Sequence, residues 1–158
     1  MPPRFDYAES RMPNEPVWTT QESVDVDVPV SSAWTFMTNV ANWSDPPAEF
    51  SLDGPFVAGA HGTTRMPGQP PTSWIIRAVV DQCSYTIEVS VAADAAVRFE
   101  WRFDPVSEQR TTLTQRVQLW GDGAAGLVDT IRAAFEPRLA SGMQRVARMM
   151  MDRLAHDR

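Results

Sequence analysis

The chain has 158 residues, of which 43% are hydrophobic and 22% are charged, and its formal net charge is −6. This length suits one domain with a substantial core, and the composition is that of a globular protein rather than a disordered one. The negative balance and the lack of adjacent basic residues argue against nucleic-acid binding, because a surface that follows phosphates needs clustered positive charge.

The usual signs of covalent or metal chemistry are missing from the sequence. All 14 basic residues are arginine, so no lysine is present to form a Schiff base or act as a general base. The single cysteine, Cys83, excludes an intrachain disulfide and a multi-cysteine metal site. No metal-binding, dinucleotide or phosphate-loop motif follows a strand, so we expect no metal and no cofactor.

The first 16 residues, MPPRFDYAESRMPNEP, are rich in proline and charge and predict an irregular N-terminal arm before a single domain over residues 17–158. They lack the apolar segment of a signal peptide, and no stretch approaches 18 uncharged apolar residues. We therefore expect a cytoplasmic protein without membrane insertion.

The first regular element is predicted at ESVDVDVPV, where Val24, Val26 and Val28 alternate with acidic residues as in a half-buried strand. Pro29 should end this strand, and Ser31 or Ser32 can cap a short helix. That helix should end near residues 40–43, because prolines 46 and 47 disfavour helical geometry before them.

The region between residues 49 and 120 alternates apolar and polar residues in successive short segments, which predicts an antiparallel sheet with one face in water. The expected inward residues are Trp74, Ile76, Ala78, Val80, Tyr85, Ile87, Val89, Val91, Val97, Phe99, Trp101, Phe103, Leu113, Val117 and Leu119.

After GDGAAG the apolar spacing changes to three or four residues, which predicts a long amphipathic C-terminal helix. Pro137 should break or kink this helix near residues 135–137 and lie in the first turn of its main part. The expected inward stripe is Val128, Ile131, Phe135, Leu139, Met143, Val146, Met150 and Leu154. A strongly bent sheet folded around this helix would bury the stripe.

Several segments resemble the polyketide cyclase/dehydrase and lipid-transfer superfamily, also called START-like, SRPBCC or birch-pollen-allergen-like. They are VDVPVSSAWTFMTNVANW, LDGPFVAGAHGTTRMPGQPPTSWIIRAV, WRFDP, TTLTQRVQLWG and AAFEPRLASGMQRVARMMMDRL. The resemblance covers about residues 20–155. It implies an α+β helix-grip fold, in which a curved antiparallel sheet of about seven strands wraps around the C-terminal helix, with short helices between strands 1 and 2.

The resemblance also implies a cavity between the sheet and the C-terminal helix, which in relatives often binds a lipid, sterol, polyketide or plant-hormone-like molecule. Some members of the superfamily are aromatases or cyclases, and many are carriers. One departure concerns NVANWSDPP, where many relatives place an apolar residue soon after the tryptophan and this chain has Asp45, Pro46 and Pro47. Trp43 is then either a lid residue at the cavity mouth or an anchor at the end of the short helix.

The candidate catalytic residues are His61 and Arg65, which share one strand face with Thr63. If this face is inward, the three residues form a polar stripe that suits a carboxylate or phenolate. If it is outward, Gly62, Thr64 and Met66 line the cavity instead.

The candidate ligand-binding residues combine large apolar groups with a few polar ones. Gln115 and Tyr85 lie on apolar strand faces, where a buried amide or hydroxyl needs a partner from the protein, water or a ligand. The full set is Trp43, Trp74, Tyr85, Phe99, Trp101, Gln115, Met143 and Met150, although the aromatic and methionine members also suit a plain core.

The sequence thus predicts a carrier or sensor that binds a hydrophobic small molecule, such as a lipid, polyketide or aromatic metabolite, as a monomer or homodimer. An aromatase/cyclase or dehydratase that uses polar cavity residues is the first alternative. A protein-interaction module is the second.

Overall fold

The computed structural model describes residues 15–43 and 45–156, so the predicted N-terminal arm lies largely outside the described residues. The elements in chain order are β1 (Trp18–Val26), α2 (Val30–Met37), the 3-10 helix η1 (Val40–Asn42), β2 (Glu49–Leu52), β3 (His61–Arg65), β4 (Thr72–Val80), β5 (Ser84–Ala92), β6 (Ala95–Ser107), β7 (Arg110–Trp120), the 3-10 helix η2 (Ala125–Leu127) and α3 (Val128–His156). None of the described helices is long and apolar enough to cross a membrane.

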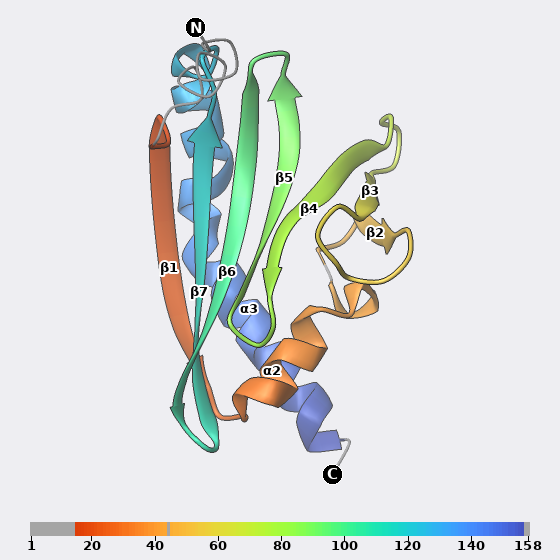
Figure 1. Cartoon of the computed structure of the whole chain (residues 1–158), viewed down its shortest axis with the longest axis vertical. Helices are drawn as coiled ribbons and strands as arrows, with labels where there is room; N and C mark the ends of the chain where they lie inside the picture. The colour runs from red at the N-terminus through yellow and green to blue at the C-terminus, as the bar shows by residue number, and fades with distance from the viewer. Residues whose placement is uncertain (1–14, 44, 157–158) are drawn as a thin grey trace, which may run out of the picture.

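The strands form one antiparallel sheet in the order β1-β7-β6-β5-β4-β3-β2. Consecutive strands pair from β2 to β7, whereas β1 and β2 lie at opposite edges. The connection between these edges contains α2 and η1, which cross one end of the sheet (Figure 1). The seven strands and the long C-terminal helix confirm the predicted helix-grip fold.

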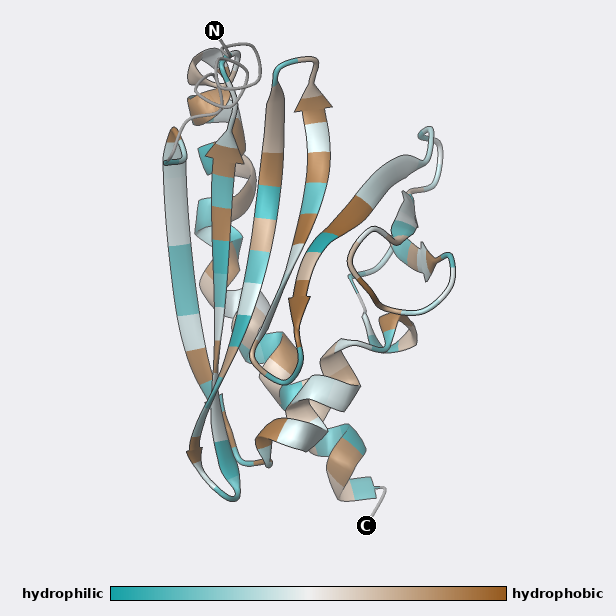
Figure 2. Cartoon of the chain, in the orientation of Figure 1, coloured by the Kyte–Doolittle hydropathy of each residue, from teal (hydrophilic) through white to brown (hydrophobic). Residues whose placement is uncertain are grey.

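The strand alternation gives the sheet an apolar inner face and a polar outer face, visible as banded strands in Figure 2. The inward residues of β6 and β7 agree with the prediction, and most of them are buried. On the outer face, acidic and basic side chains form ion pairs, among them Arg98–Glu88 at 2.8 Å and Arg110–Asp25 at 3.0 Å.

The α3 helix lies behind β1 and β7 in its first part and reaches α2 in its second (Figure 1). Its N-terminal half packs in a cluster with Trp18, Val97, Val117 and Leu119 of the sheet. Its C-terminal half, through Met143, Ala147 and Met150, packs in a second cluster with α2 and the other end of the sheet. The predicted inward stripe of this helix is therefore buried or half-buried.

Four local predictions were wrong. The α3 helix continues through Pro137 without the predicted break, and this proline lies inside the helix rather than in its first turn. Both halves of the helix bury apolar residues, which outweighs one missing backbone hydrogen bond. The N-cap of α2 is Pro29, whose extended conformation starts the helix at Val30, before the serines expected to cap it. A register shift between Ile76 and Ala78 leaves Ala78 and Val80 exposed. Val91 is exposed as well, where a second register shift lies between Ser90 and Ala92.

Candidate functional site

A connected set of aromatic rings fills the interior between α2, the β2–β3 loop and the inner face of β4–β6. The rings of Phe56 and Tyr85 lie 4.9 Å apart in an edge-to-face arrangement, and those of Trp34 and Phe103 lie 5.0 Å apart. The Trp43 ring lies 5.4 Å from Trp74. Such edge contacts add to the stabilisation from apolar burial and leave the site lined by π-faces and ring edges.

Trp43 points into this interior. Its indole N–H donates to the carbonyl oxygen of Met37 at 2.8 Å, and its ring contacts Phe50 at 5.6 Å and Phe56 at 6.4 Å. Its hydrogen bond is made to the end of α2, so Trp43 has the geometry of the helix-end anchor. Its ring also forms the inner support of the pocket described next.

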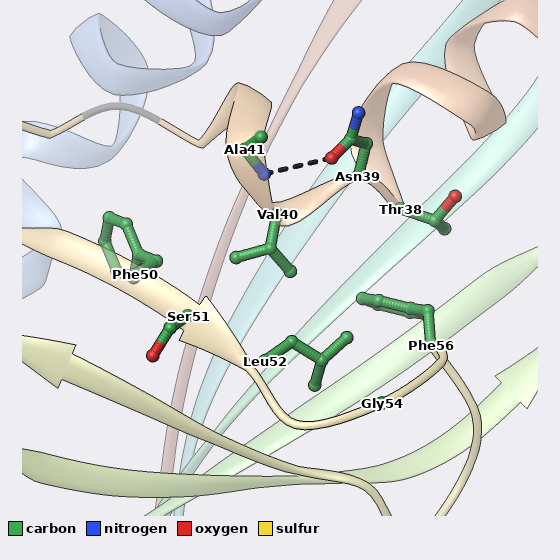
Figure 3. Close-up of a pocket in the computed structure, with 9 residues that line it drawn as sticks. All are labelled: Thr38, Asn39, Val40, Ala41, Phe50, Ser51, Leu52, Gly54 and Phe56. Carbon is green, nitrogen blue, oxygen red and sulfur yellow. Dashed lines mark hydrogen bonds between the residues drawn. The ribbon is translucent and has the colours of Figure 1, made fainter.

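A pocket of about 360 Å³ opens at the surface between the C-terminal end of α2, η1 and β2 (Figure 3). The apolar side chains of Val40, Leu52 and Phe56 point toward one another in this pocket. The remaining lining residues are Thr38, Asn39, Ala41, Phe50, Ser51 and Gly54. Phe50 and Phe56 contact Trp43 as well, so the pocket wall is continuous with the interior rings.

The hydroxyl group of Tyr85 is buried and has no hydrogen-bond partner among the described residues. Tyr85 is only 1% exposed and is surrounded by the rings of Trp34, Phe56 and Phe103. Burial raises the pKa of this phenol, so the group is a neutral O–H that can donate one bond and accept others. A buried hydroxyl without a partner costs about 1–3 kcal/mol, which a ligand oxygen would recover.

The structure places His61 and Arg65 on the outer face of the sheet, where both are exposed. Gly62 and Thr64 face inward instead, the second of the two orientations that the sequence left open. The Thr64 hydroxyl oxygen accepts the indole N–H of Trp74 at 3.1 Å. A Cβ at Gly62 would lie 2.1 Å from the Trp74 ring, so glycine is needed for this close approach.

Most of the predicted ligand-binding residues belong to the same interior cluster. Met143 and Met150 are fully buried in the cluster that contains Tyr85, Trp74 and Trp101. Phe99 instead packs in the second cluster, where it meets Phe135 edge-to-face at 5.3 Å. Gln115 is half-buried on the inner face and lies opposite Trp101 in the β6–β7 register.

Two arginines of α3 hold the segment around Trp43 from outside. Arg145 contacts the carboxylate of Asp45 at 3.2 Å, and Arg153 donates to the side-chain oxygen of Asn42 at 3.0 Å. Both contacts are exposed, so each contributes little to stability, and together they connect Asn42 and Asp45 to α3. Asp45 is thus an ion-pair partner of the terminal helix.

Phe50 and Phe56 are site residues that the sequence analysis did not identify. Phe50 precedes Leu52 by two positions on β2, so an alternation over this short strand was a usable signal. Phe56 comes from an exposed loop, where the sequence distinguishes it only as an aromatic residue between Gly54 and Gly59. Among the described residues, no group of histidine, cysteine and carboxylate side chains has the arrangement of a metal site.

Fold and site together define a helix-grip domain whose interior is apolar and aromatic, with an unpartnered hydroxyl within it. The family model of polyketide cyclase/dehydrase and lipid transport proteins matches residues 17–154. The chain therefore belongs to this family.

Solved structures with the same fold confirm this architecture. A norcoclaurine synthase point mutant from Thalictrum flavum, in complex with a transition state analogue, has a TM-score of 0.63 at 11% identity, over 89% of this chain and 96% of that one. A protein from Arthrobacter aurescens has a TM-score of 0.65 at 13% identity, over 85% and 86% of the two chains. Ara h 8.0201 has a TM-score of 0.60 at 15% identity, over 88% and 98%. A search of curated proteins found no match.

Proposed function

We propose that the protein binds a hydrophobic small molecule in the interior between the sheet and α3, as a carrier or sensor. Membership of a family of polyketide cyclases, dehydrases and lipid transport proteins supports a role of this general kind. The observation that carries the proposal is the Tyr85 hydroxyl, which is buried among apolar rings without a partner. A ligand oxygen would satisfy this group while the ligand's apolar part replaces ring contacts.

A carrier or sensor fits the interior better than the cyclase alternative. Acid–base catalysis needs a group within hydrogen-bonding reach of the reacting atoms. His61 and Arg65 face outward, and the inward Thr64 hydroxyl already bonds to Trp74, so Tyr85 and Gln115 remain as candidates on the inner face. A cyclase or dehydratase function based on the candidate residues would act through these two. They can orient an oxygen, but neither changes its charge near neutral pH.

The proposal is tested by ligand uptake in the wild-type protein. Native mass spectrometry of freshly purified protein should show a co-purifying small molecule, or saturable one-to-one binding of a naphthalene-based fluorescent probe that fatty acids or aromatic ketones displace. NMR spectra of labelled methionine methyls should change at the buried Met143 and Met150. Binding on the exposed side of α3 would leave these two buried methyls unchanged, so the methyl signals distinguish interior binding from surface binding.

Gln118 provides a matched control for Gln115, because both lie on β7 but on opposite faces of the sheet. Gln115→Ala should change probe affinity, whereas Gln118→Ala should leave it unchanged. Absence of any uptake, or uptake that leaves the Met143 and Met150 methyls unaffected, would overturn the proposed function.

A further inference from the structure

Phe56 separates the surface pocket from the Tyr85 side chain. It lines the pocket of about 360 Å³, and its ring also lies 4.9 Å from the Tyr85 ring at an interplanar angle of 79°. Trp43 borders the same ring at 6.4 Å and 82°. The space that Phe56 occupies is therefore the size of one six-membered ring, with aromatic neighbours on the inside and the pocket on the outside.

The loop that carries Phe56 is attached to the rest of the molecule mainly at its ends. Backbone hydrogen bonds join Asp53 to His61 at one end and Gly59 to Ile76 at the other. Within the described chain, the backbone hydrogen bonds of residues 54–58 are confined to the loop itself. Every residue from 54 to 58 is exposed except Phe56, so its ring is the group that holds the loop tip inward.

Both ends of the loop contain a glycine with a positive φ. Gly54 has φ +88° and Gly59 has φ +94°, and neither has another residue's atoms near the place of a Cβ. These two positions have access to backbone conformations closed to other residues. A movement of the loop tip would therefore meet no Cβ clash at these two positions.

A phenylalanine ring offers no lone pair to a neighbouring hydroxyl group. The Tyr85 O–H remains unpartnered although Phe56 packs directly against its ring. A molecule that filled the same space with an equivalent ring and also carried an acceptor oxygen would make the contacts of Phe56 and one additional hydrogen bond.

We infer that Phe56 is a removable plug, and that the ligand is a flat aromatic ring bearing a carbonyl or ether oxygen, which displaces the Phe56 ring and accepts a hydrogen bond from Tyr85. The inference rests on the proposed function, which it makes specific in ligand class and in route of access. The ligand passes through the pocket between α2, η1 and β2, and the Phe56 loop moves outward as the ring enters.

The test uses two probes of nearly equal shape, acetophenone and isopropylbenzene, because only the first carries an acceptor oxygen. Titration followed by NMR or calorimetry should show that Phe56→Ala binds both probes more tightly than the wild-type protein, since no side chain competes for the space. The affinity of acetophenone relative to isopropylbenzene should be about three- to tenfold higher in this variant than in Phe56→Ala/Tyr85→Phe, the range expected for one neutral hydrogen bond.

Two further variants make the result specific. The double variant Phe56→Ala/Tyr85→Phe gives this comparison, because it lacks the O–H donor and keeps the space left by Phe56. Val57→Ala changes an exposed side chain, 49% accessible, in the same loop, and should bind as the wild-type protein does. Phe56→Leu, which keeps an apolar but non-aromatic side chain, takes the place of Phe56→Ala if circular dichroism shows that the alanine variant is unfolded.

The inference is overturned if removing the Phe56 ring leaves affinity unchanged, or if the affinity of acetophenone relative to isopropylbenzene is the same with and without the Tyr85 hydroxyl. Uptake by the wild-type protein with signals at Met143 and Met150, but no effect of Phe56, would retain the proposed function and reject the plug. No binding to the wild-type protein or to any variant would reject both.

Discussion

The indole N–H of Trp43 donates to the carbonyl oxygen of Met37 with an N···O distance of 2.8 Å. Met37 is the last residue of α2, so this bond satisfies a carbonyl that has no partner within the helix. It also turns the Trp43 ring inward, against Phe50, Phe56 and Trp74. One side chain thus ends the helix and supports the aromatic interior.

Trp43→Phe should lower the free energy of unfolding by about 1–2 kcal/mol, because it removes this hydrogen bond and part of a packed ring. Urea denaturation gives the measurement. Trp120→Phe is the matched control, since Trp120 donates a longer bond of 3.3 Å to Gln118 on the outer face. An equal or larger loss for Trp120→Phe would contradict the anchoring role of Trp43.

Gly62→Ala should destabilise the protein by about 1–3 kcal/mol, because the new Cβ would overlap the Trp74 ring, whose nearest atom is 2.1 Å away. Near-ultraviolet circular dichroism should report the displaced indole. Gly142→Ala is the control: it lies inside α3, has free space around it, and should be neutral or stabilising by up to about 1 kcal/mol. A neutral Gly62→Ala would show that Trp74 does not occupy this position.

Thr111→Val should cost about 1–3 kcal/mol, although the two side chains have the same shape. The Thr111 hydroxyl is fully buried and donates to the Val28 carbonyl oxygen at 2.9 Å, which valine would leave without this partner. In contrast, Thr114→Val removes an exposed bond to Ser23 and should cost less than about 1 kcal/mol. Thermal unfolding of both variants measures the two losses of stability, and equal losses would contradict the expectation.

Asp25 should titrate below its ordinary pKa of 3.8, primarily because the Thr112 hydroxyl bonds to its carboxylate at 2.6 Å and secondarily because Arg110 does so at 3.0 Å. A lowered pKa in the folded state means that this carboxylate stabilises the fold above pH 3.8 and that the effect is lost as the pH falls through the folded-state value. NMR titration of the Asp25 carboxyl carbon measures the midpoint. Thr112→Val should raise it toward 3.8 and Arg110→Gln should raise it less; no change in Thr112→Val would be inconsistent with this cause.

The sequence predicted the architecture because strand alternation and helix periodicity are properties of the local chain. Val97, Trp101, Phe103 and Leu113 are inward and buried as their alternation required. Met143 and Met150 likewise lie on the buried side of α3. The family resemblance then supplied the order in which these elements pack, and the family model over residues 17–154 agrees with it.

Other features depended on contacts between distant segments, which the local pattern does not contain. Pro137 stays within α3 because the sheet and α2 hold the helix on both sides of it. The register shift after Ile76 moves Ala78 off the inner face. The local pattern allows His61 to face either side of the sheet. The close approach of Gly62 to the Trp74 ring places Gly62 on the inner face and therefore His61 on the outer one.

The sequence by itself therefore determined the strands, the long helix and the apolar character of the inner face, because hydrophobic spacing is encoded along each element, and its family resemblance supplied the helix-grip arrangement. Only the tertiary structure decided that an exposed loop inserts Phe56 beside Tyr85 and that the Tyr85 hydroxyl has no partner among the described residues. The physical reason is that hydrogen-bond satisfaction of a buried group depends on every segment that surrounds it, and these segments are far apart in the chain.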